Sequence, residues 1–176
     1  EITILTGNNG SGKSLIRKQL GHKLDKGLIS LSTLDRMKPK EHLSALKNIM
    51  IDNEDDSTAA SSYFILTKFF KEIEKNKKVK YAIIDEPEIG CSDETKLAFG
   101  IYLNKMMSKY NHVGYLVITH SSHIVRNINE HNFYNIDKND LTKDEWLNRK
   151  IEPTNLEMLY DNNINLNAKL YKERKK

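Results

Sequence analysis

The sequence predicts an α/β fold in which a mostly parallel central sheet is flanked by helices. Three apolar runs suited to buried strands lie at residues 2–7, 79–86 and 113–120, and helix-like segments separate them. Alternation of strands and helices at this spacing is typical of parallel sheets covered by helices on their faces. The 176 residues are enough for one ordinary domain that folds without disulfides.

The first half of the chain is expected to form strand, helix, strand and then two further helices. These elements are predicted at residues 2–7, 12–26, 27–32, 40–51 and 57–75. Pro39 precedes the fourth element, and the polar run at 53–57 separates it from the fifth. Asp56 or Ser57 can cap the last helix, because short polar side chains accept hydrogen bonds from the first free N–H groups.

The second half repeats the alternation and then weakens. Its predicted elements are a strand at 79–86, a helix at 92–110, a strand at 113–120, a helix opening at Ser121 or Ser122, an edge strand at 132–136, and short helical pieces at 141–146 and 155–160. We therefore expect a core over residues 1–136 with a short helical insert near 33–76. Residues 137–176 are expected to be a C-terminal extension of the same domain.

Composition excludes several classes of protein. The net charge of +4 is a mild excess, which permits contact with nucleic acid without arguing for it. The single cysteine, Cys91, excludes an internal disulfide framework and a cysteine-based zinc site, and a reducing, cytoplasmic location is expected. No apolar run approaches the roughly 20 residues that cross a bilayer, so no membrane partner is expected.

Residues 7–14, GNNGSGKS, fit the phosphate-loop pattern G-x-x-x-x-G-K-[ST] without deviation. The predicted phosphate-binding residues are Gly7, Asn8, Asn9, Gly10, Ser11, Gly12, Lys13 and Ser14. Glycines allow the tight turns that aim backbone N–H groups inward, and Lys13 supplies a mobile charge for the β- and γ-phosphates. The Ser14 hydroxyl can ligate Mg²⁺. A chance match in a glycine turn is the alternative, which the strand before the loop and the helix after it disfavour.

Two adjacent acids and a histidine end the other two apolar strands. Asp85 is predicted to hold Mg²⁺ through water, and Glu86 to orient and deprotonate a water aimed at the γ-phosphorus. His120 would lie at the same edge of the sheet and contact the γ-phosphate or that water, so Lys13, Glu86 and His120 are the predicted catalytic residues. The simpler alternatives are acids exposed at a strand end and a structural histidine.

Together these segments resemble the ATP-binding-cassette (ABC) ATPases, most closely the stand-alone members that serve no transporter. GNNGSGKS is similar to their Walker A motif, IIDEPE to the Walker B motif with its catalytic Glu, and VITH to the switch-histidine strand. The resemblance implies a reduced ABC ATPase-like domain of the P-loop NTPase class. It also implies Mg²⁺-dependent ATP hydrolysis by a head-to-tail homodimer with nucleotide at the interface.

The chain departs from this family at two motifs. The family's signature motif usually opens the helix before Walker B with Ser-Gly-Gly, and here residues 57–62 read STAASS. Ser57 could still contact a partner's γ-phosphate, or the segment could be an ordinary capped helix start. The family's glutamine is also missing, because Gln19 lies on the helix after the phosphate loop. A residue near 32–36 would have to replace it, or that coupling is absent.

Two other functions stay open at this point. The first is a nucleotide-gated binding or regulatory module with little turnover, which associates with DNA or inhibits another protein. A lysine-rich stretch at residues 68–80 could contact DNA, although a solvated helix face is the commoner explanation. The less favoured function is a small-molecule kinase, since the five arginines form no cluster suited to a lid.

Overall fold

The computed structural model describes residues 1–8, 10–24, 27–32, 58–138, 140–150 and 164. Its centre is a sheet of five parallel strands in the order β2-β3-β4-β1-β5. The strands are β1 (Ile2–Thr6), β2 (Leu28–Ser32), β3 (Tyr81–Asp85), β4 (Gly114–Ile118) and β5 (Asn132–Asn135). The predicted α/β class with a parallel sheet is confirmed, and β5 is the edge strand expected at residues 132–136.

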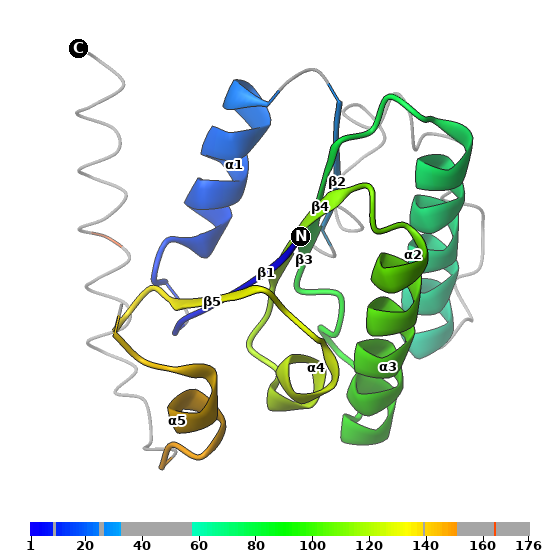
Figure 1. Cartoon of the computed structure of the whole chain (residues 1–176). Helices are drawn as coiled ribbons and strands as arrows, with labels where there is room; N and C mark the ends of the chain where they lie inside the picture. Colours follow the sequence, from blue (N-terminus) through cyan, green and yellow to red (C-terminus); the bar gives the residue numbers. More distant parts are fainter. Residues whose placement is uncertain (9, 25–26, 33–57, 139, 151–163, 165–176) are drawn as a thin grey trace.

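Five helices surround the sheet in the described part of the chain. They are α1 (Lys13–Lys23), α2 (Thr58–Lys75), α3 (Asp93–Lys109), α4 (Ser122–Asn127) and α5 (Lys143–Leu147). Figure 1 shows α1 on one side of the sheet and α2 and α3 on the other. The helices predicted at 40–51 and 155–160 lie outside the described residues. No helix among the residues with an assigned structure combines the length and the apolar character that crossing a membrane requires.

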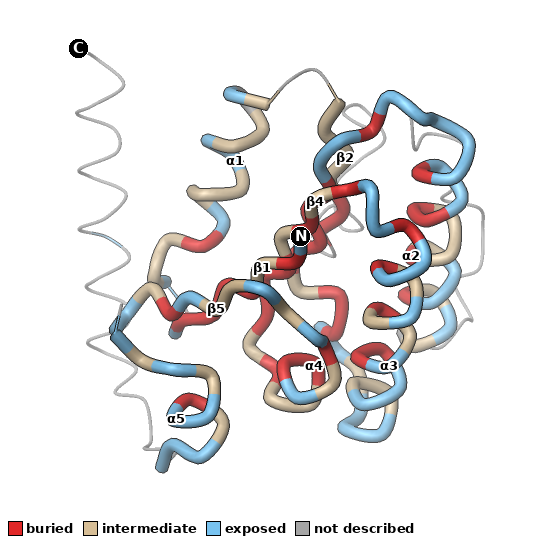
Figure 2. The backbone as a smooth tube through the Cα atoms, viewed as in Figure 1, coloured by how far each residue is buried: buried red, intermediate tan, exposed pale blue. Residues whose placement is uncertain are grey.

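Alternation along the strands divides the apolar residues between two layers. Leu5, Ile83 and Ile118 form a small cluster with Ile16 and Leu20 of α1. The neighbouring strand residues, which point to the opposite face, enter the main core under α2, α3 and α4. Strands buried on both faces read as continuous apolar runs, which explains why three of them were visible in the sequence. Figure 2 shows this burial concentrated along the strands.

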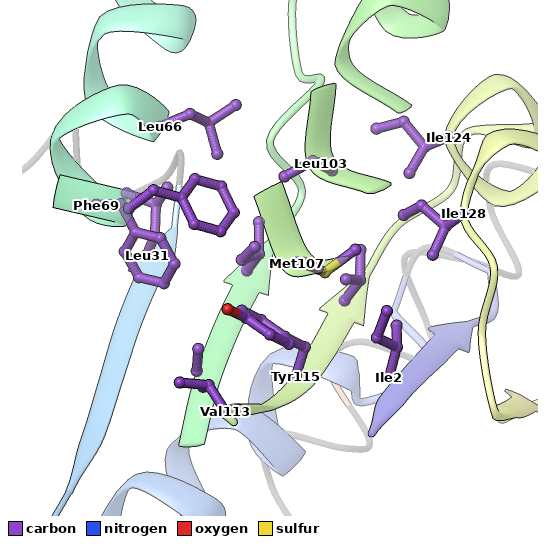
Figure 3. Close-up of a cluster of buried hydrophobic side chains, with 14 of the residues drawn as sticks. Ile2, Leu31, Leu66, Phe69, Leu103, Met107, Val113, Tyr115, Ile124 and Ile128 are labelled. Carbon is purple, nitrogen blue, oxygen red and sulfur yellow. The ribbon is translucent and has the colours of Figure 1, made fainter. Parts of the chain in front are cut away.

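The main core is built from large side chains of the covering helices. Leu66 and Phe69 of α2, and Leu103 and Met107 of α3, pack above Tyr115 of β4 (Figure 3). All of these side chains are buried, and each buried apolar side chain of this size contributes about 1.5–3 kcal/mol. This layer therefore anchors the sheet and fixes the relative heights of its strands.

Register aligns the carboxyl ends of the central strands. Asp85 of β3 pairs with Ile118 of β4, and Ile118 pairs with Leu5 of β1. Ser32, the last residue of β2, lies opposite Asp85. The segments that follow β1, β3 and β4 consequently leave the sheet at one edge, which is where ligands bind in open α/β sheets.

Candidate functional site

The loop after β1 contains three glycines whose backbone conformation suits phosphate binding. Gly7, Gly10 and Gly12 have φ values of 154°, 79° and 97°, which lie in the region that favours glycine. A Cβ on Gly7 would lie 2.8 Å from Ser11 Oγ and 3.3 Å from Ile136 Cβ, so any side chain there would push the loop apart. The glycines predicted from the motif are therefore required by the fold itself.

Helix α1 begins at this loop without a side-chain cap. Its N-cap residue is Gly12, in left-handed conformation, and Lys13 is its first residue. The first N–H groups of a helix lack partners within the helix and carry the positive end of its dipole. An uncapped start at the end of a glycine loop suits an anionic ligand such as a phosphate.

Lys13 lies folded into the loop and is only 5% exposed. Its Nζ donates to the backbone oxygens of Gly7 at 2.9 Å and Asn8 at 2.8 Å, and to Ser11 Oγ at 3.4 Å. Burial lowers the pKa of Lys13. Four surrounding carboxylates oppose that shift, those of Glu86, Asp137, Asp85 and Glu88. The loop lysine and the acids after β3 therefore share one electrostatic environment.

Asp85 is the last residue of β3, and its buried carboxylate is contacted by the hydroxyl of Ser32 and the guanidinium of Arg17. It is 2% exposed, Ser32 Oγ donates to its Oδ2 at 3.2 Å, and Arg17 Nε lies 3.2 Å from the same oxygen. Sequence reasoning gave Arg17 no role. The sequence feature that could have indicated a role for Arg17 is its position four residues after Lys13, which puts both side chains on one face of α1.

Glu86 and His120 meet directly. His120 Nε2 lies 2.7 Å from Glu86 Oε1, and the Glu86 backbone N–H donates to Ile118 O at 2.8 Å. Glu86 is the only non-glycine residue with positive φ, at 49°, among the residues that the structure describes. The hydrogen bond from His120 lowers the pKa of the Glu86 carboxyl, although partial burial opposes it. A non-glycine residue held in this strained region is typical of functional sites.

Glu88 is a third acid at this edge, to which the sequence analysis assigned no role. It is 5% exposed, and its Oε1 accepts hydrogen bonds from Thr119 Oγ1 and from the His120 backbone N–H, the latter at 3.2 Å. Burial raises the pKa of the Glu88 carboxyl. Its place two residues after Glu86 was the available signal, but only the fold shows that it faces inward.

The turn that follows β5 contacts the glycine loop that follows β1. The Asn8 backbone N–H donates to Asp137 Oδ2 at 2.5 Å. Asn135 holds this turn, since its Oδ1 accepts from the N–H groups of Asp137 and Lys138 at 3.1 and 2.9 Å. Asn135 Nδ2 also donates to Thr6 Oγ1 at 3.0 Å, which ties the turn to the end of β1. No motif in the sequence pointed to these contacts.

The structure brings some of the predicted site residues together, and others lie outside the described residues. Lys13, Asp85, Glu86 and His120 are brought to one edge of the sheet, and Ser14 is an exposed residue in the first turn of α1. Asn9 and Ser57 lie outside the described residues. Of the hydroxyl-rich segment at 57–62, Ser62 is buried on α2.

The oxygen atoms of this chain at this edge could bind Mg²⁺ only if a phosphate ligand supplied further oxygens. Among the described residues, no three His, Cys, Asp or Glu side chains cluster in a way that could hold a metal ion. Mg²⁺ in phosphate-transfer sites is usually bound by one or two protein oxygens, waters and the substrate phosphates. The buried carboxylate of Asp85 and the Ser14 hydroxyl at the start of α1 match that pattern.

Comparison with known proteins supports the fold. The chain is similar to the SMC head domain from Thermotoga maritima, with 13% identity and a TM-score of 0.50, over 77% of this chain and 85% of that one. A nucleotide-free ATP-binding cassette from an ABC transporter aligns with 16% identity and a TM-score of 0.41, over 77% of this chain and 76% of that one. No family model and no curated protein matches the sequence.

The chain is thus similar in its α/β fold to that SMC head domain. At this level of identity the likeness extends to architecture alone, so the chemistry has to be argued from the residues.

Proposed function

We propose that this chain binds ATP together with Mg²⁺ and hydrolyses its terminal phosphoanhydride bond. One observation carries the proposal: Lys13 and the Glu86–His120 pair lie at the same sheet edge, close enough that Glu86 acts on the charge of Lys13. A phosphate-binding loop alone would account for binding. The added acid and imidazole are what hydrolysis needs.

The loop and the start of α1 hold the triphosphate. Lys13 exchanges its bonds to the Gly7 and Asn8 carbonyls for the β- and γ-phosphate oxygens, and first-turn N–H groups of α1 donate to them. Ser14 and Asp85 would hold the Mg²⁺, which would neutralise charge on the phosphate oxygens. Preference for ATP follows from the resemblance to ABC ATPases, as does the use of Mg²⁺.

Glu86 acts as the general base. The hydrogen bond from His120 lowers the pKa of the Glu86 carboxyl and so favours the ionised form, which can accept a proton from water, although the same bond weakens it as a base. The water oxygen bonds to the γ-phosphorus as the bond to the bridging oxygen breaks, and ADP and phosphate leave. His120 shares a hydrogen bond with Glu86 before nucleotide arrives and can turn to the γ-phosphate afterwards.

A second copy of the chain would complete the site. In the head-to-tail arrangement that the resemblance implies, the partner's residues 57–62 face the γ-phosphate. This part of the proposal depends on the sequence, because Ser57 lies outside the described residues.

Phosphate release from ATP without any added acceptor tests the proposal. Glu86→Gln should retain nucleotide binding and lose turnover by about 10²–10⁴-fold, because the base is gone and the loop is intact. Lys13→Ala should lose nucleotide binding itself, measured by calorimetry or a fluorescent ATP analogue. Lys18→Ala is the matched control, since Lys18 is an exposed lysine on the same helix.

The other outcomes separate the competing functions. Wild-type turnover by Glu86→Gln would remove the base assignment. Tight ATP binding with no phosphate release by the wild type would favour the nucleotide-gated module. Formation of ADP and a phosphorylated product only when a hydroxyl acceptor is added, with no free phosphate, would favour a kinase.

A further inference from the structure

Glu88 lies on the turn between β3 and α3 and joins two strand ends. Its Oε1 accepts a hydrogen bond from Thr119 Oγ1 and a second from the His120 backbone N–H at 3.2 Å. Thr119 is fully buried, and its Oγ1 also accepts from the Ser121 N–H at 2.9 Å. The carboxyl of Glu88 therefore fixes the backbone on both sides of the Thr119–His120 peptide bond.

This contact adjoins the Glu86–His120 pair, because both contacts involve His120. Glu86 is two residues before Glu88, and His120 is the residue whose N–H Glu88 holds. The side chains of Glu86 and His120 meet at 2.7 Å on the exposed side of the same two chain segments. A change in the Glu88 contact would shift both members of the pair relative to each other.

The Glu88 carboxyl is buried, which favours its uncharged form. Oε2 is buried and has no hydrogen-bond partner within the described residues, a cost that a merely structural position would avoid. Burial raises the pKa of its carboxyl, although the hydrogen bonds that the carboxyl accepts, including those from Thr119 and from the His120 N–H, oppose the shift. The pKa values of the two neighbouring carboxyls, Glu86 and Glu88, are thus shifted in opposite directions, and the one with the lowered pKa is the proposed base.

We propose that Glu88 is a positioning residue for the proposed hydrolysis: by holding the Thr119–His120 backbone, its Oε1 sets His120 Nε2 against Glu86 Oε1. The inference depends on the proposed function for its catalytic consequence. The contact that it assigns to Glu88 can be tested separately.

The test compares Glu88→Gln with Glu88→Leu. Glutamine keeps an uncharged Oε1 acceptor of the same shape, whereas leucine fills similar space and removes the acceptor. We expect Glu88→Gln to keep kcat within about twofold, and Glu88→Leu to lower kcat by about 10- to 100-fold with a much smaller change in KM for ATP. Glu94→Leu is the matched control, because Glu94 is an exposed acid on the neighbouring helix α3.

Amide hydrogen exchange of the His120 N–H, followed by NMR, provides a readout that needs no turnover. Protection should survive in Glu88→Gln and fall in Glu88→Leu. If Glu88→Leu does not fold, the partner is changed instead: Thr119→Ser should keep kcat and protection, and Thr119→Val should lose both.

Unchanged kcat and unchanged His120 protection in Glu88→Leu would overturn the inference. Equal loss in Glu88→Gln and Glu88→Leu would also overturn it, because the acceptor would then not be what matters. A wild type that releases no phosphate contradicts the proposed function, while His120 protection still reports on the Glu88 contact.

Discussion

Glu86 and Glu88 are separated by a single residue in the sequence, yet the fold shifts the pKa of their carboxyls in opposite directions. A hydrogen bond from His120 lowers the pKa of Glu86, and burial raises the pKa of Glu88. Pro87 between them is buried, and Glu86 adopts positive φ, so the chain turns sharply at this point. The turn leaves one carboxyl beside the imidazole and places the other inside.

The raised pKa of Glu88 predicts how its replacement changes stability with pH. The folded state holds this proton more tightly than the unfolded chain, so the stabilisation is complete below the unfolded pKa of about 4.3 and is lost as pH rises through the folded pKa. Glu88→Gln escapes that loss. The melting temperature of Glu88→Gln relative to wild type should therefore rise by a few degrees between pH 4.5 and pH 8.

Glu94→Gln is a control of opposite sign. Hydrogen bonds from its own backbone N–H and from Ser92 lower the pKa of the exposed Glu94 carboxyl, so its stabilisation is present above the unfolded pKa. Its replacement should lower the melting temperature slightly at pH 8 and not at low pH. A Glu88→Gln difference that stays constant with pH would contradict the assignment of Glu88 as the buried acid.

At the scale of elements, α3 packs closely on α4, the helix that follows His120 at the end of β4. Gly100 of α3 is buried, and a Cβ there would lie 2.9 Å from Asn127 Cβ and 3.0 Å from His123 O. Ser121, the residue after His120, caps α4 by accepting from the Ile124 N–H. The position of α4 and the direction in which His120 leaves β4 are therefore coupled.

Gly100→Ala should destabilise the protein by about 1–3 kcal/mol, because the added methyl group meets backbone and Cβ atoms that cannot move independently. Urea unfolding followed by circular dichroism measures this. Gly21→Ala is the matched control on α1, where a Cβ meets nothing within 4 Å, and it should stabilise by about 0.5–1 kcal/mol. Equal effects at the two sites would show that α3 and α4 are not packed this closely.

At the scale of the whole molecule, strand order assembles the site. In the order β2-β3-β4-β1-β5, β4 lies between the strand before the phosphate loop and the strand before the acids. His120 follows the strand between those two, and its Nε2 lies 2.7 Å from Glu86 Oε1. In the proposed dimer, the second copy would approach the γ-phosphate at this edge of the sheet.

Nucleotide should therefore control assembly. Glu86→Gln with Mg²⁺ and ATP is expected to run as a dimer in size-exclusion chromatography with light scattering, since bound ATP adds contacts that stabilise the dimer. Lys13→Ala should stay monomeric under the same conditions, as should Glu86→Gln without nucleotide. A Glu86→Gln protein that binds ATP and stays monomeric at all accessible concentrations would contradict the head-to-tail arrangement.

The sequence determined the features that are encoded locally. The glycine loop, Lys13, the acid pair and His120 are each contiguous with an apolar run, and strands buried on both faces produce runs that are easy to see. The α/β class and the common edge follow from the alternation of strands and helices.

Tertiary structure alone decided the contacts between segments far apart in the chain. Asp137 accepts from the Asn8 N–H across 129 residues, and Glu88 reaches Thr119 across 31. Arg17 reaches Asp85 only because α1 packs on the face of β3. Such contacts depend on strand order and on register, where a shift of one residue would turn every strand side chain to the opposite face, and no local pattern records either.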